Sequence, residues 1–140
     1  LMIDQDKKEE GLFIKNWHSP PTLKELKNSL EEVKKNRNKK KIKFKQEPPI
    51  LHIACRNPDD AKEILKKARK TGWKKSGILS WERNGSIVEL NSTEKLEFPI
   101  IHYNELLVDE KFLKIALKES KERIKKGWKK IENLEKELKQ

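Results

Sequence analysis

Apolar positions along the chain fall into short segments that follow either the two-residue period of a strand or the longer period of a helix. Strands are predicted at 12–17, 42–45, 50–55, 77–81, 86–90 and 96–102, and Leu1–Asp4 reads as the tail of another. The segment at 50–55 is almost continuously apolar, so we expect it to be more fully buried than the alternating strand at 42–45. Asn84-Gly85 predicts a tight hairpin turn, and Pro99 predicts an edge strand or a bulge.

Helical segments are predicted between these strands, each with a recognisable start. Thr22 and Glu25 have the spacing of a capping box, and the segment that follows carries Leu23, Leu26, Leu30 and Val33 on one face. Asn57-Pro58 combines a favoured cap with a favoured first helical residue. Gly72 suits the end of that second helix.

The last helix is predicted to be long, over 109–140. Its apolar stripe has a period near 3.5 residues and comprises Phe112, Leu113, Leu117, Ile124, Trp128, Ile131, Leu134 and Leu138. The sequence therefore predicts an α+β fold in one domain, residues 1–140, with a mixed or antiparallel sheet, two shorter helices and one long C-terminal helix. No GxGxxG or GxxxxGK[ST] motif occurs, so a Rossmann fold is not expected.

Charge changes this picture. Charged residues make up 41% of the chain and the formal net charge is +11, a field that attracts polyanions such as nucleic acid. A Lys- and Glu-rich surface of the kind found in hyperthermophiles would give a similar composition without any nucleic-acid partner. The basic run 34–41 and the lysines of the last helix could contact phosphates, or could simply be solvated.

Cys55 is the only cysteine, which excludes an intrachain disulfide and a cysteine-based metal centre. His and Cys residues show no metal-binding spacing, so no metal is expected. The chain has no apolar run of membrane-spanning length and no basic-then-apolar leader. We therefore expect no membrane partner and a cytoplasmic location; the sequence does not predict an oligomeric state.

Hydroxyl-bearing and aromatic residues are the candidates for ligand binding. Lys75–Gly77 is predicted to be a turn, and the loop containing Ser92 and Thr93 could join it in surrounding a polar ligand. Alternatively, these residues serve backbone geometry alone. Among the tryptophans, Trp73 and Trp81 are the better candidates for stacking on bases, whereas Trp128 is expected in the core.

These motifs, in this order, resemble those of the tRNA wybutosine-synthesising protein 3 family. The resemblance rests on Lys-Phe-x-x-Glu-Pro at 43–48, Leu-His-Ile-x-Cys-Arg at 51–56, Asp-Ala at 60–61, Gly-Trp at 72–73, Ser-Gly-Ile at 76–78, Ser-Thr at 92–93 and Leu-Glu-Phe-Pro at 96–99. The segment at 12–18 and the Val-Asp-Glu at 108–110 before the long helix are similar too.

The resemblance implies an S-adenosyl-L-methionine-dependent methyltransferase with a distinct α+β fold. Its substrate would be 7-(3-amino-3-carboxypropyl)-4-demethylwyosine, the base next to the anticodon in the anticodon loop of tRNA-Phe, methylated on nitrogen 4. By the same resemblance Ser76, Gly77, Ser92 and Thr93 would bind the cofactor, and His18, His52, Arg56 and Glu97 would bind the substrate. No residue is assigned as a catalytic base.

Members of the family also carry an upstream Ser-Ser-Cys-Ser-Gly-Arg motif, which this sequence does not contain. We therefore expect either a longer protein, of which this is a part, or a shortened paralogue. Three hypotheses follow: the tRNA methyltransferase, a non-catalytic tRNA-binding paralogue, and a charged structural module without an RNA partner.

Overall fold

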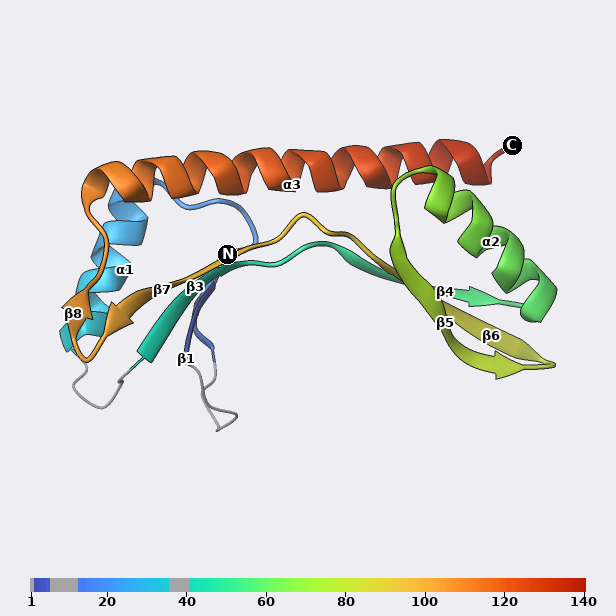
Figure 1. Ribbon diagram of the computed structural model, residues 1–140, viewed down its shortest axis with the longest axis horizontal. Helices are drawn as coiled ribbons and strands as arrows, with labels where there is room; N and C mark the ends of the chain where they lie inside the picture. The colour runs from blue at the N-terminus through green and yellow to red at the C-terminus, as the bar shows by residue number, and fades with distance from the viewer. Residues whose placement is uncertain (1, 6–12, 36–40) are drawn as a thin grey trace. The chain divides into compact units, whose positions relative to one another are not determined.

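The computed structural model of the chain describes residues 2–5, 13–35 and 41–140 (Figure 1). Its strands are β1 (Met2–Gln5), β2 (Phe13–Asn16), β3 (Lys41–Gln46), β4 (Ile50–Cys55), β5 (Lys75–Glu82), β6 (Gly85–Asn91), β7 (Leu96–His102) and β8 (Glu105–Leu106). Its helices are α1 (Leu23–Lys35), α2 (Pro58–Lys70) and α3 (Glu110–Leu138). The predicted α+β class, with two shorter helices and a long C-terminal one, is confirmed.

The chain divides into two compact units, each built from two stretches of sequence. Unit 1 consists of Leu1–Glu47 and Lys95–Glu122, and unit 2 consists of Pro48–Glu94 and Arg123–Gln140. The strands form two antiparallel sheets rather than one, so of the two predicted arrangements the antiparallel one is correct. That residues 1–140 act as a single domain stays a prediction.

Unit 1 contains a sheet with strand order β2-β1-β3-β7-β8. One face of it is covered by α1 and by the first part of α3, and the buried core joins Leu26, Leu30, Val33, Ile42, Phe44, Ile100, Ile101, Leu113 and Leu117. The capping box is confirmed, since the Glu25 amide donates to Thr22 Oγ1 at 3.2 Å and the Thr22 amide donates to Glu25 Oε2 at 2.9 Å. Pro99 sits opposite Lys43 beside a register shift at which Ile100 is the extra residue of β7, as expected for a bulge.

Unit 2 contains a sheet with strand order β4-β6-β5. Its core, on the side of α2 and the last part of α3, joins Cys55, Ala61, Ala68, Trp73, Val88, Leu90 and Leu134. Asn57 caps α2 as predicted, accepting from the Asp60 amide at 2.8 Å, and Gly72 follows the helix with a φ of +96°.

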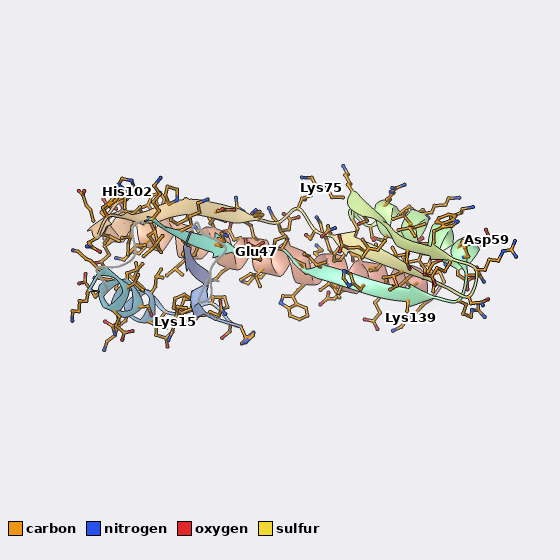
Figure 2. All side chains as sticks on the ribbon, turned by 90° about the horizontal axis from the view of Figure 1, so that it is seen from below. Lys15, Glu47, Asp59, Lys75, His102 and Lys139 are labelled. Carbon is orange, nitrogen blue, oxygen red and sulfur yellow. The ribbon has the colours of Figure 1, made fainter. Side chains whose placement is uncertain are left out.

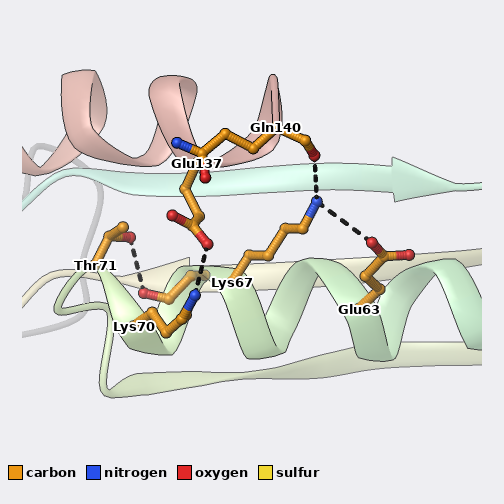
Figure 3. Close-up of polar contacts among 7 residues, drawn as sticks. Glu63, Lys67, Lys70, Thr71, Glu137 and Gln140 are labelled. Atoms are coloured by element: carbon orange, nitrogen blue, oxygen red, sulfur yellow. Dashed lines mark hydrogen bonds and ion pairs between the residues drawn. The ribbon is translucent and has the colours of Figure 1, made fainter.

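Polar contacts join α2 to the end of α3 within unit 2 (Figure 3). Lys70 pairs with Glu137 at 3.0 Å, and Lys67 donates to the backbone oxygen of Gln140 at 3.2 Å while pairing with Glu63 at 3.3 Å. These surface pairs link the two helices but add little stability each.

The tryptophan predictions are wrong in two cases. Trp73, expected to be available for stacking, is 0% exposed and its Nε1 donates to the Lys130 oxygen at 3.4 Å. Trp128, expected in the core, is 63% exposed, because the buried side of α3 there runs through Gly127 instead. Trp81 is exposed as expected, with Lys62 Nζ 5.1 Å from its ring centroid.

The remaining expectations fall partly outside what the structure describes. Residues 36–40 of the basic run lie beyond the described ranges, while Lys34 and Lys35 line an open hollow of about 370 Å³ with Glu31 and Asn104. Among the residues described, no helix is both long and apolar enough to cross a membrane. The same residues contain no cluster of three or more potential metal ligands.

Candidate functional site

The candidate site lies on the outer face of the unit 2 sheet, which we define as the face opposite α2. Side chains alternate between the faces of a strand, so Val88 and Leu90 enter the core while Ile87 and Glu89 point outward. The prediction that 50–55 is more fully buried than 42–45 is wrong, because Ile50, His52 and Ala54 are exposed on the outer face. This face is thus accessible to a ligand.

A row of three residues crosses the outer face. His52 on β4 pairs with Glu89 on β6, and Glu89 pairs on its other side with Gly77 on β5. A Cβ added to Gly77 would meet no heavy atom within 4 Å, so the surface above this end of the row is empty. The row therefore brings a predicted substrate residue and a predicted cofactor residue to either side of Glu89.

Both carboxylate oxygens of Glu89 are hydrogen-bonded. Asn91 Nδ2 donates to Oε1 at 2.8 Å, and His52 Nε2 lies 2.7 Å from Oε2. These two bonds, the one from Asn91 first, lower the pKa of Glu89 below its ordinary value of 4.5. Glu89 is therefore ionised near neutral pH and acts only as an acceptor.

The four predicted cofactor residues lie at one end of the β5–β6 hairpin, but not on one face: Ser76 pairs with the core-facing Leu90, whereas Gly77 pairs with the outward-facing Glu89. The predicted turn at Lys75–Gly77 is wrong. Those residues belong to β5, because they pair in register with Glu89–Asn91 of β6. Ser76 Oγ accepts from the Asn91 amide at 3.2 Å, which ties the end of β6 to β5. In Figure 2 the Lys75 side chain extends away from the sheet at this end.

Ser92 and Thr93 follow directly after β6. Ser92 is buried, its amide donates to the Pro49 oxygen at 3.2 Å, and its Oγ accepts from the Glu94 amide at 3.4 Å. Thr93 is exposed. Glu94 in turn pairs with Lys130 of α3 at 2.7 Å, so this loop is held from both sides.

Arg56 does not join the row. It leaves the end of β4 and its Nε donates to Asp60 Oδ2 at 2.9 Å, at the start of α2. Both residues line an open hollow of about 380 Å³, together with Ala54, Cys55, Glu63, Ile64, Lys67 and Leu138. The Arg56 side chain, 89% exposed, remains accessible to a phosphate.

The two other predicted substrate residues, His18 and Glu97, belong to unit 1. His18 is exposed just after β2. Glu97 on β7 lies 3.0 Å from Lys95 Nζ and 3.5 Å from Lys43 Nζ, and its hydrogen bond with Lys95 is the main cause that lowers its pKa. Glu97 thus serves to hold lysines in place on this surface.

Sequence reasoning missed Glu89 and Asn91. Their outward positions follow from the alternation of β6, but their pairing with His52 depends on a long-range register that the sequence does not display. The hairpin register also shifts between Ile78 and Ser80, and without this shift Gly77 would face the core.

Comparison with known proteins decides the family. Residues 3–140 match the family described as Methyltransferase TYW3. The chain belongs to this family. Two TYW3-type relatives carry the name tRNA(Phe) 7-((3-amino-3-carboxypropyl)-4-demethylwyosine(37)-N(4))-methyltransferase. The Archaeoglobus fulgidus protein is 30% identical over 98% of this chain, and the Methanocaldococcus jannaschii protein is 35% identical over 89% of it.

The chain spans 68% and 62% of the lengths of these two relatives. Among solved structures, the PH1069 protein from Pyrococcus horikoshii superposes with a TM-score of 0.83 at 24% identity, over 99% of this chain and 69% of that one. A protein from Aeropyrum pernix gives 0.73 at 21% identity, over 96% and 81%. These likenesses show that the TYW3 chain shares their fold.

Proposed function

We propose that this chain methylates nitrogen 4 of 7-(3-amino-3-carboxypropyl)-4-demethylwyosine in the anticodon loop of tRNA-Phe, with S-adenosyl-L-methionine as donor, in the cytoplasm. One observation carries the proposal: the chain is a TYW3 family member throughout residues 3–140, and relatives 30–35% identical bear the name of this methyltransferase. The net charge of +11 suits a polyanionic substrate.

The hydroxyls at the end of the β5–β6 hairpin fit the polar part of such a donor. The Ser76 oxygen already accepts from a backbone amide, which leaves its hydroxyl proton to be donated to a ligand carboxylate. Ser92 is buried and would contribute through the loop that its hydrogen bonds hold in place. Thr93 adds an exposed hydroxyl beside them. S-adenosyl-L-methionine, when bound, supplies a methyl group on a positively charged sulfur.

The remaining predicted residues would hold the tRNA. His52 presents its ring on the outer face of the sheet, where it can hydrogen-bond the edge of a base. Arg56 and His18 are exposed and can contact phosphates or sugars, and Glu97 keeps Lys43 and Lys95 in position for the same purpose. Methyl transfer to a ring nitrogen then depends chiefly on alignment of the two reactants.

The experiment that tests the proposal starts from tRNA of cells stalled before the nitrogen-4 methylation. The tRNA is incubated with the chain and S-adenosyl-L-methionine, and the hypermodified nucleoside is weighed by mass spectrometry. We expect the gain of one methyl group. The double variant Ser76→Ala, Thr93→Ala should keep its fold but bind the donor more weakly, as measured by calorimetry.

The alternative, a non-catalytic tRNA-binding paralogue, predicts a different result. In that case the chain binds tRNA, but the mass of the nucleoside stays unchanged and the donor does not bind. Unchanged donor affinity in the double variant would instead refute the assignment of Ser76 and Thr93 alone.

A further inference from the structure

The contacts of Glu89 determine which nitrogen of His52 carries a proton. An ionised carboxylate cannot donate, so His52 Nε2, 2.7 Å from Glu89 Oε2, must be the donor of that bond. In the neutral ring Nδ1 is then the unprotonated nitrogen. The side-chain amide of Asn91, whose Nδ2 donates to Glu89 Oε1 at 2.8 Å, restrains rotation of the Glu89 carboxylate.

The surroundings of the row suit a flat aromatic ligand. Gly77 leaves open space beside Glu89. Ile50 and Ile87 are 54% and 40% exposed on the same outer face, one on each side of the His52–Glu89 pair, and Ala54 pairs directly with Ile87. Apolar side chains around a few precisely placed polar groups are typical of the lining of small-molecule sites.

We propose that Glu89 is a positioning residue of the methyl-transfer site: it holds His52 with Nδ1 unprotonated, so that Nδ1 accepts the proton of the base nitrogen that is methylated. This inference rests on the proposed function and adds the role of Glu89 to it.

The methyl transfer needs no further reactant. The N–H bond of the base breaks as the nitrogen bonds to the incoming methyl carbon, and the leaving sulfur keeps the electron pair of its broken bond. The proton moves to His52 Nδ1, which makes the ring an imidazolium facing the Glu89 carboxylate. The carboxylate stabilises that cation, as an orienting acid does for a histidine base in other enzymes.

The first test does not depend on activity. The chain is labelled with nitrogen-15 in its histidines, and the ring nitrogens of His52 are observed by NMR in the free protein. We expect protonated Nε2 and unprotonated Nδ1 in the unaltered chain and in Glu89→Gln, which keeps an acceptor oxygen. Glu89→Leu should show a mixture of both tautomers, and Glu132→Leu, the same change on an exposed position of α3, should not.

The second test separates turnover from binding. With saturating donor and tRNA, we expect Glu89→Leu to lower kcat about 100-fold, the range of one acid–base contribution, with little change in tRNA affinity. Glu89→Gln should fall between this variant and the unaltered chain, and Glu132→Leu should match the unaltered chain. Gly77→Val provides an independent probe, since it should raise the KM for S-adenosyl-L-methionine, in line with the predicted cofactor role of Gly77, while leaving the His52 tautomer intact.

The outcomes distinguish the two proposals. An unaltered chain that transfers no methyl group refutes the proposed function, and the role of Glu89 with it. A chain that methylates tRNA while Glu89→Leu retains full kcat overturns the role of Glu89 alone. Equal tautomer populations in the unaltered chain and in Glu89→Leu would also overturn it, whatever the kinetics.

Discussion

The carboxylate of Glu97 and the ammonium group of Lys95 change each other's titration in unit 1. Their hydrogen bond is the main cause that lowers the pKa of Glu97 below 4.5 and raises the pKa of Lys95 above 10.5. The stabilisation linked to Glu97 is fully present above pH 4.5 and is lost as the pH falls through its lowered pKa. That linked to Lys95 is present below pH 10.5 and is lost as the pH rises through its raised pKa.

Lys95→Gln should therefore reduce the free energy of unfolding near neutral pH, and the difference from the unaltered chain should vanish in strong acid. Denaturant titrations at several pH values measure it, with Lys41→Gln, an exposed position on β3, as the matched control. A difference that persists after Glu97 is protonated would show that the pair does not cause it.

Gly127 is required by a close approach within unit 2. A Cβ at this position would lie 3.1 Å from two ring carbons of Pro49, and the Pro49 oxygen is held by the Ser92 amide. In an exposed helix Gly→Ala gains about 1 kcal/mol, but here we expect Gly127→Ala to lose about 1 kcal/mol through overpacking. Thermal unfolding of both single variants and of the double variant with Pro49→Ala measures this. In the Pro49→Ala background Gly127→Ala should become stabilising, and a gain already in the unaltered background would contradict the prediction.

At the scale of the element, α2 depends on its cap. Asn57 Oδ1 accepts from the Asp60 amide at 2.8 Å, which satisfies one of the free amides at the helix start. Asn57→Ala should therefore lower the free energy of unfolding by about 1 kcal/mol. Asn133→Ala, in an exposed position inside α3, is the control and should be neutral or slightly stabilising, because alanine is the better helix former.

The elements also show where sequence reasoning succeeds and where it fails. Caps such as Thr22 and Asn57 are local, so their spacing alone predicted both helix starts. The side of the sheet on which Gly77 lies depends on a bulge between Ile78 and Ser80, and no local sequence pattern predicts that bulge. The apolar periodicity of α3 predicted that Trp128 is buried, but the buried residue is its neighbour Gly127. Periodicity alone does not distinguish the two positions, because the burial of Gly127 depends on a contact with Pro49, which is distant in sequence.

The same distinction applies to the candidate site. Ser76, Gly77 and His52 come from motifs of the family, and the structure places them on one small sheet. Glu89 lies between His52 and Gly77 only because of strand pairing, so no sequence motif predicted its role. Glu97 and His18 belong to unit 1, a division that the sequence did not predict.

At the scale of the whole molecule, the net charge of +11 predicts how steeply the affinity for RNA falls with salt. A protein that displaces counterions from several phosphates loses affinity steeply with salt, on the order of 10³-fold between about 50 and 200 mM. We expect this slope for tRNA-Phe, measured by fluorescence anisotropy. Donor affinity, which involves no phosphate backbone, should stay nearly constant over the same range. A tRNA affinity that is flat or undetectable at low salt would instead support the structural module without an RNA partner.

Cys55 gives the chain a chemical reporter of local opening. Its thiol is 8% exposed at the end of β4, and desolvation, with a smaller effect of Asp60, raises its pKa. Because it is the only cysteine, a thiol reagent can add one label per chain. The labelling rate in native buffer then equals the reagent's rate on an open thiol multiplied by the fraction of time that the β4–α2 junction is open. Asn57→Ala should speed the labelling, whereas Thr22→Ala in unit 1 should not. The labelling rate, followed by mass spectrometry, thus measures how often the β4–α2 junction opens in the absence of denaturant.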